Sequence, residues 1–261
     1  MPTLRTDDGV TLSYQAFGDG PTTLVFMHGW AGSGAYFNET IQHLSLGDLR
    51  VITFDYRGHG DSEKVDNGYT LERFARDTFE VADRAGAGKF VVVGFSMSGK
   101  FAQYLQLLQS DRVRGQVLVS GFPATEIPFP AELQQDWVNR AGDSQKMSDL
   151  LTNGFLSQPV KPEVLQRFAT EAARIPAVAL DETLNMAVKT SFIEQIKGSN
   201  LPTLCIGGLS DGFVTPDLIR QAMVAPFPGS RMALVDCNHE IPMERPQELA
   251  GLIEAFLAGL R

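Results

Sequence analysis

The sequence predicts an α/β protein with a mostly parallel, twisted sheet flanked by helices. Short apolar or β-branched runs alternate along the chain with longer stretches whose apolar residues recur every three or four positions. This alternation is typical of parallel strands joined by helical crossovers. The chain has 261 residues, of which 43% are hydrophobic and 20% charged, so it contains enough apolar material for a buried core.

The predicted strands begin at residues 11–17, where polar and apolar residues alternate as in a half-exposed strand. Six later runs are continuously apolar, which is typical of buried central strands. They are residues 23–27, 51–54, 90–93, 116–119, 203–206 and 232–235. The spacing of apolar residues predicts crossover helices at residues 70–85, 98–109, 216–224 and 246–260.

The pattern changes after residue 122. No further buried strand is predicted before residue 203, and the intervening segment has helical spacing interrupted by several prolines. We therefore expect residues 1–122 and 198–261 to form the core and residues 123–197 to form an inserted helical cap.

The composition excludes several classes of partner. The formal net charge is −9, whereas sequence-independent binding to nucleic acid depends on Lys and Arg. No segment reaches the ~18 apolar residues of a membrane helix, and the start has no signal-like run, so we expect a cytoplasmic protein that binds no membrane. Cys205 and Cys237 are too few and too distant to suggest a metal site, and we expect buried thiols. Homo-oligomer formation stays open.

The strongest local signal is the GxSxG pattern at residues 94–98, which lies between an apolar run and a helical stretch. A serine on a sharp strand-to-helix turn needs small neighbours, because other chain segments approach its backbone closely. The first amides of the following helix point at the reacting centre. We therefore predict that Ser96 is a nucleophile held at the top of the sheet.

Together with this motif, four segments give the chain a resemblance to the α/β-hydrolase superfamily. They are His28-Gly29-Trp30, residues 55–62 (DYRGHGDS), residues 207–211 (GGLSD) and Asn238-His239. The chain resembles in particular the small esterases, lactonases and cofactor-free haloperoxidase-like perhydrolases. The resemblance covers the whole chain and implies an α/β-hydrolase fold with no cofactor or metal. Ser98 departs from the glycine that close relatives often have, and we expect its hydroxyl to hydrogen-bond locally.

The catalytic histidine is identified from the chain order nucleophile, acid, histidine that the resemblance implies. Of the four histidines, only His239 follows Ser96. His239 is therefore predicted to be the general base. The resemblance implies structural roles for His28 and His59, and His43 is expected on an exposed helix.

The acid must orient the imidazole and stabilise its charged form, so it should lie on a strand-end loop beside the histidine loop. Asp211 follows the apolar run at residues 203–206 and matches the superfamily's usual position. The alternatives are Asp217, which suits the first turn of a helix, together with Asp236 and Glu126. The resemblance implies that Asp55 and Arg57 are structural.

The site must also contain hydrogen-bond donors for the oxyanion and side chains that contact the substrate. The backbone amides of Trp30 and Met97 are expected to form the oxyanion hole. Trp30, Phe122 and Trp137 are predicted to contact substrate. The cap segment offers further apolar side chains, most of them expected in its own core, at Phe129, Met147, Phe155, Phe168, Met186 and Phe192.

This set of residues predicts a serine hydrolase that cleaves a carboxylic ester or lactone of a small, mainly apolar substrate through an acyl-enzyme. A perhydrolase or a carbon–carbon bond hydrolase of the same fold remains an alternative. A non-catalytic receptor for a small ligand is the alternative from another class. Neutral substrates are expected, unless Lys100 or Arg140 turns into the pocket.

Overall fold

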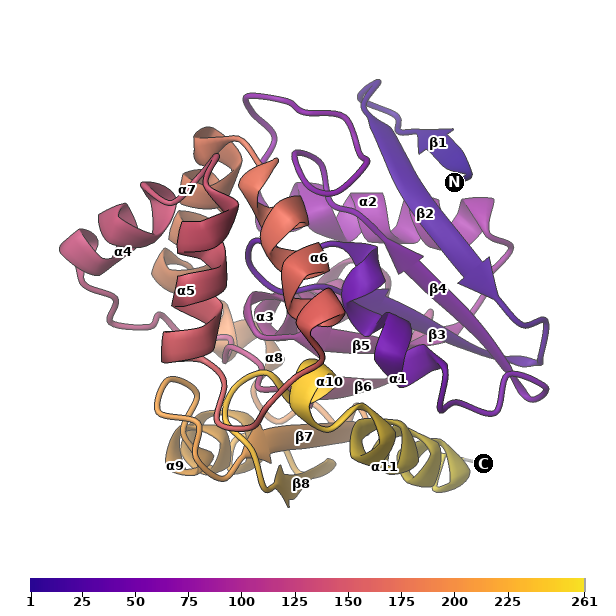
Figure 1. Cartoon of the computed structure of the whole chain (residues 1–261). Helices are drawn as coiled ribbons and strands as arrows, with labels where there is room; N and C mark the ends of the chain where they lie inside the picture. The colour runs from indigo at the N-terminus through magenta and orange to yellow at the C-terminus, as the bar shows by residue number, and fades with distance from the viewer. Residues whose placement is uncertain (261) are drawn as a thin grey trace.

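An eight-stranded sheet organises the chain in the computed structural model, which describes residues 1–260 (Figure 1). The strands lie side by side in the order β1, β2, β4, β3, β5, β6, β7 and β8. The first two strands are antiparallel to their neighbours, and the other six are parallel. Their bounds are β1 Thr3–Arg5, β2 Thr11–Phe17, β3 Thr22–Met27, β4 Leu49–Phe54, β5 Phe90–Phe95, β6 Val113–Val119, β7 Thr203–Gly208 and β8 Ser230–Val235.

All seven predicted strands are present, but one was placed wrongly. Residues 232–235 were expected in a buried central strand, whereas β8 is an edge strand that pairs with β7 alone. Only Val235 of β8 is fully buried, and Leu234 is 38% exposed. The three-residue strand β1 was not predicted, because so short a segment has no readable period.

The helices between the strands lie close to their predicted positions. Helices α2 (Leu71–Arg84) and α3 (Met97–Gln109) connect parallel strands as predicted, whereas α11 (Pro246–Ala258) follows the last strand, β8, so the prediction of a crossover helix there is wrong. Helix α2 begins where the Thr70 side chain accepts a hydrogen bond from the Arg73 amide, which caps the first turn. The helix predicted at residues 216–224 is α9 (Pro216–Ile219) followed by one π-helical stretch, η2 (Arg220–Val224). The short helices η1 (Gly34–Phe37), α1 (Asn38–Ile41) and α10 (Ile241–Glu244) complete the set outside residues 123–197.

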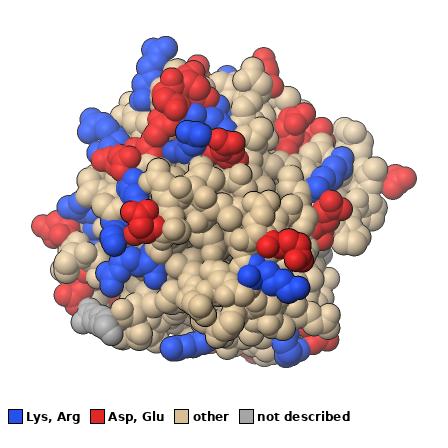
Figure 2. All heavy atoms as spheres, turned by 180° about the vertical axis from the view of Figure 1, so that it is seen from behind, with Lys and Arg blue, Asp and Glu red and all other residues tan. Residues whose placement is uncertain are grey.

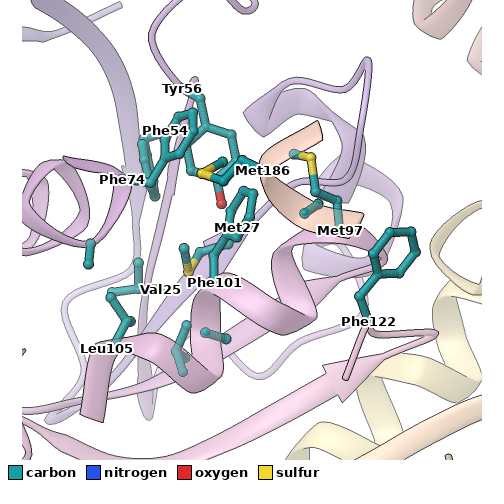
Figure 3. Close-up of a cluster of buried hydrophobic side chains, with 14 of the residues drawn as sticks. Val25, Met27, Phe54, Tyr56, Phe74, Met97, Phe101, Leu105, Phe122 and Met186 are labelled. Carbon is teal, nitrogen blue, oxygen red and sulfur yellow. The ribbon is translucent and has the colours of Figure 1, made fainter. Parts of the chain in front are cut away.

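Two hydrophobic clusters cover the two faces of the sheet. Val25 and Met27 of β3 belong to one cluster, which includes Phe74 of α2 and Phe101 of α3 (Figure 3). The rings of Phe74 and Phe101 stack with their centroids 5.3 Å apart. Leu24 and Phe26 of the same strand point to the other cluster, with side chains of α1 and α11. This alternation along β3 buries both faces of the central sheet.

Five helices lie between β6 and β7, beyond the carboxyl ends of the parallel strands (Figure 1). They are α4 (Ala131–Val138), α5 (Ser144–Gly154), α6 (Pro162–Ala173), α7 (Ala177–Lys189) and α8 (Ile193–Ile196). All five fall within residues 123–197, the segment expected to form a cap. Their buried side chains join both clusters of the sheet, for example Leu180 in the first and Leu151 in the second.

The surface carries mixed charge. On the face opposite to that of Figure 1, acidic and basic side chains lie close to one another around a broad uncharged centre (Figure 2). Within residues 1–260, no helix combines the length and the apolar character needed to cross a bilayer.

Candidate active site

Ser96 lies on a sharp turn between β5 and α3. Its φ of 53° and ψ of −122° are unusual for a residue with a side chain, and surrounding backbone contacts hold this geometry. The Ser96 amide donates to the Val119 carbonyl at 2.9 Å, and the Ser96 carbonyl accepts from the Phe122 amide at 2.8 Å. These two bonds fix the turn against the end of β6.

Glycine is required on both sides of this turn. A Cβ atom on Gly94 would lie 2.4 Å from the Ser98 carbonyl oxygen, and one on Gly99 would lie 2.4 Å from the Cα atom of Gly121. Neither position has room for a side chain. Ser98, which was expected to hydrogen-bond locally, contacts the Tyr56 hydroxyl at 2.8 Å and donates to the His28 carbonyl.

His239 lies on the loop between β8 and α10, and the structure brings it to Ser96. Its Nε2 atom is 2.9 Å from Ser96 Oγ, and its Nδ1 atom is 2.8 Å from Asp211 Oδ2. Because an ionised carboxylate only accepts hydrogen bonds, Nδ1 carries the proton and Nε2 accepts from Ser96. The His239 backbone is held as well, since its amide donates to the Phe155 carbonyl at 3.1 Å.

Asp211 is fixed by the loop that follows β7. Its Oδ1 atom accepts hydrogen bonds from the amides of Phe213 at 2.9 Å and Val214 at 2.8 Å. The second oxygen, Oδ2, is thereby left for the imidazole. All three side chains, Ser96, Asp211 and His239, are buried.

The alternative acids lie elsewhere. Asp217 is exposed and pairs with Arg220. Asp236 and Glu126 are both exposed, and neither forms a hydrogen bond with His239. Of the four candidates, only Asp211 contacts the imidazole.

Two backbone amides are available next to Ser96. A Cβ atom on Gly29 would lie 3.2 Å from Ser96 Cβ, so the loop that carries Trp30 passes directly beside the serine. Met97 begins α3, so its amide lacks an intrahelical acceptor. Among the backbone hydrogen bonds of the turns, loops and helix caps of residues 1–260, none has the Trp30 amide or the Met97 amide as its donor. The Trp30 indole donates to the Leu180 carbonyl at 2.9 Å, which ties this loop to α7.

The other histidines lie outside the pocket at Ser96. His28 accepts from the Tyr56 amide at 3.2 Å through Nε2, so its Nδ1 donates to the Gly29 carbonyl at 2.9 Å. Burial lowers the pKa of His28 well below its usual range, and burial also lowers the pKa of His59 to about 4. His43 is exposed as expected, but it lies in the turn after α1 and not in a helix.

Asp55 and Arg57 form buried hydrogen bonds that connect separate segments of the chain. Asp55 accepts hydrogen bonds from the amides of Gly34 and Asp61 at 2.6 and 2.8 Å. The Arg57 guanidinium, 1% exposed, bonds to both oxygens of Asp77 at 2.8 and 2.9 Å. Neither residue lines the pocket at Ser96.

An apolar pocket opens above Ser96 and His239. The three predicted substrate contacts, Trp30, Phe122 and Trp137, all line it. So do the cap-segment residues Met147, Phe155 and Phe168, whereas Phe129, Met186 and Phe192 pack elsewhere. Sequence reasoning missed the other lining residues, which are Ala31, Tyr36, Phe95, Leu150, Leu151, Leu184, Phe213 and Glu240. Of these, Phe95 and Glu240 could have been found from their position next to Ser96 and His239.

Neither Lys nor Arg lines this pocket within the described residues. Lys100 points away from it, because its ammonium group donates to the carbonyls of Thr125 and Thr190 at 2.8 and 2.7 Å. Burial lowers the pKa of Lys100 to about 7. Arg140 pairs with Asp136 of α4 at 2.8 Å and does not line this pocket. Cys205 and Cys237 are buried free thiols, as expected.

Comparisons with known proteins agree with this architecture. A family model described as alpha/beta hydrolase fold matches residues 22–246. A non-heme chloroperoxidase of Streptomyces lividans is 35% identical over 267 residues, which cover 92% of this chain and 96% of that protein. A bifunctional esterase/perhydrolase of Acinetobacter calcoaceticus is 25% identical, with 88% and 92% covered. The enol-lactonase of Burkholderia xenovorans LB400 superposes with a TM-score of 0.87 at 20% identity, over 98% of this chain and 100% of that one.

Proposed function

The chain belongs to the α/β-hydrolase fold family, and from this premise we propose that it is a serine hydrolase acting on a carboxylic ester or lactone through an acyl-enzyme. The observation that carries the proposal is the continuous hydrogen-bonded series Asp211, His239, Ser96 at the floor of an apolar pocket. A serine hydroxyl is a weak nucleophile until an adjacent base accepts its proton, and this series supplies that base.

The first half-reaction uses each of these groups. Ser96 Oγ attacks the carbonyl carbon while its proton moves to His239 Nε2, and Asp211 stabilises the imidazolium that forms. The amides of Trp30 and Met97 donate to the oxyanion, and one such donor contributes about 3 kcal/mol to lowering the barrier. His239 then protonates the leaving oxygen, and the carbon–oxygen bond breaks.

The second half-reaction releases the acyl group. A water molecule gives its proton to His239 and attacks the Ser96 ester through the same oxyanion. Ser96 leaves as its hydroxyl form when His239 returns the proton. The residues required are those of the first step, so a single site serves both.

The pocket supports a small, mainly apolar and neutral substrate. Its walls are aromatic and aliphatic side chains, among them Trp30, Trp137 and Phe155. A carboxylate-bearing substrate would need a Lys or Arg partner, and both candidates, Lys100 and Arg140, are engaged elsewhere.

Perhydrolysis is a second candidate, favoured by two relatives whose names are non-heme chloroperoxidase and esterase/perhydrolase. In that reaction hydrogen peroxide replaces water, gives its proton to His239 and leaves with the acyl group as a peracid. The acyl-enzyme is the same. Peracid formation from an ester and peroxide, measured beside hydrolysis, separates the two activities.

The proposal is tested with the purified protein and an activated phenyl ester. We expect turnover, and we expect a serine-directed phosphonate to abolish it by attaching to Ser96 in peptide mass mapping. Ser96→Ala should remove both turnover and labelling, while Ser62→Ala, at a buried serine outside the pocket, should retain them. A protein that turns over no ester or lactone, yet melts at higher temperature with a small ligand, would be a receptor instead.

A further inference from the structure

Two polar side chains in the Ser96 pocket have no hydrogen-bond partner within residues 1–260. They are Tyr36, through its hydroxyl, and Glu240, through Oε2. Both residues are more than nine-tenths buried, at 6% and 5% exposure. Leaving a buried polar group unpaired is unfavourable, so two of them at one otherwise apolar pocket call for an explanation.

Packing fixes the Tyr36 ring in the pocket wall. The ring stacks on Phe95, the residue before Ser96, with centroids 5.0 Å apart, and meets Phe168 of α6 edge to face at 5.5 Å. Tyr36 belongs to η1, which contacts α10, the helix that begins directly after Glu240. The two unpaired groups therefore come from neighbouring elements.

Glu240 follows His239 directly and lines the pocket beside it. The nearby Glu244 carboxylate is fully engaged, since it accepts hydrogen bonds from the Ser157 and Gln158 amides at 2.9 and 2.6 Å. Glu240 has no such bonds. Its burial, together with the negative charge of Glu244, raises the pKa of the Glu240 carboxyl well above its usual range. A neutral carboxyl group donates as well as accepts hydrogen bonds.

We propose that Glu240 and Tyr36 together bind a neutral hydrogen-bonding group of the substrate, a hydroxyl or a carbonyl, close to the ester that Ser96 attacks. This rests on the proposed function and narrows it. The preferred substrates are then esters or lactones that carry one such group on an otherwise apolar skeleton. A purely hydrocarbon substrate leaves both groups unpaired, and a pocket that contains unpaired groups discriminates against it.

The test uses pairs of esters of equal length. One member of each pair has a methylene at a chosen position, and the other has a carbonyl or a hydroxyl-bearing carbon there. This position lies on the acyl side in one series and on the alcohol side in another. The measured quantity is the ratio of kcat/KM for the polar ester to that for its hydrocarbon partner. In the wild type we expect about a tenfold or larger ratio in one series. Tyr36→Phe and Glu240→Leu should each lower that ratio severalfold, because each variant loses more kcat/KM for the polar ester than for its hydrocarbon partner.

Glu240→Gln is the control variant, because its amide is neutral and also donates and accepts. It should keep most of the preference. An ester with an ammonium group in the same position tests whether the Glu240 carboxyl is ionised or neutral. If the wild type prefers that ester and Glu240→Gln does not, the carboxyl is ionised and the proposal is wrong. A wild-type ratio near one, or one unchanged in Tyr36→Phe and Glu240→Leu, overturns the proposal but leaves the serine hydrolase intact. Failure to hydrolyse any ester overturns both.

Discussion

Replacing Asp211 by asparagine tests how the site sets the tautomer of His239. The introduced amide keeps the hydrogen bonds from the Phe213 and Val214 amides only if its oxygen takes the place of Oδ1. Turning it over would lose both bonds, at about 1 kcal/mol each, and would face its NH2 group toward two N–H groups. The NH2 group therefore points at His239 Nδ1, in place of Oδ2 at 2.8 Å.

This orientation has a chemical consequence. His239 Nδ1 has to accept a hydrogen bond, so the imidazole proton moves to Nε2, which is the atom that faces Ser96 Oγ at 2.9 Å. The histidine then presents a donor where a base is needed, and the imidazolium loses its opposite charge. By analogy with the same substitution in other serine triads, we expect turnover to fall about 10⁴-fold, which corresponds to ~5.5 kcal/mol.

The assay is kcat for an activated phenyl ester, with the thermal midpoint measured on the same preparation. Asp211→Asn should melt near the wild type, because both backbone hydrogen bonds are retained. Asp217→Asn, at an exposed carboxylate paired with Arg220, is the matched control and should keep full activity. Turnover within tenfold of wild type in Asp211→Asn would refute this account of the triad.

Three further perturbations follow from the fold. Lys100→Met leaves the Thr125 and Thr190 carbonyls without their donor, so the free energy of unfolding in urea should fall by about 2 kcal/mol; no change would show that the two bonds contribute nothing. Burial lowers the pKa of His59 to about 4, so on acidification this side chain takes up a proton in the unfolded protein at a higher pH than in the folded protein. The free energy of unfolding should therefore decrease by about 3 kcal/mol as the pH falls from about 6.5 to 4. In His59→Asn, the urea midpoint should depend less steeply on pH over this range. Gly99→Ala should cost about 1–3 kcal/mol and lower activity, because its Cβ would meet Gly121, whereas Gly251→Ala, with no atom within 4 Å, should cost nothing.

The sequence was sufficient to select the three residues that the structure joins at the pocket. Ser96 and Asp211 each follow an apolar run that ends at the same edge of the sheet, and chain order left only one histidine. Parallel strands bring such distant segments together whatever the details of packing. Asp217 lies only six positions from Asp211, and the structure adds what the sequence does not contain: Asp211 contacts His239, whereas Asp217 is exposed and pairs with Arg220.

The pocket walls could not be predicted in the same way. Phe155 and Phe168 line the pocket, whereas Phe192 packs against Tyr104 outside it, although all three are apolar residues in the same segment. Which of them faces Ser96 depends on how the helices pack, and that is a tertiary property. The exposed position of β8 was missed for a similar reason, since an apolar run does not reveal its place in the strand order.

The two hydrophobic clusters each extend from the sheet into the five helices between β6 and β7. Leu180 shares its cluster with Val25, and Leu151 shares its cluster with Phe26. Separating these helices from the sheet would therefore expose apolar surface in both clusters at once. We expect amide hydrogen exchange in α5 and α7 to occur by the same global opening that exposes the central strands, and exchange in these helices at a much lower opening free energy would instead indicate that they move as a separate lid.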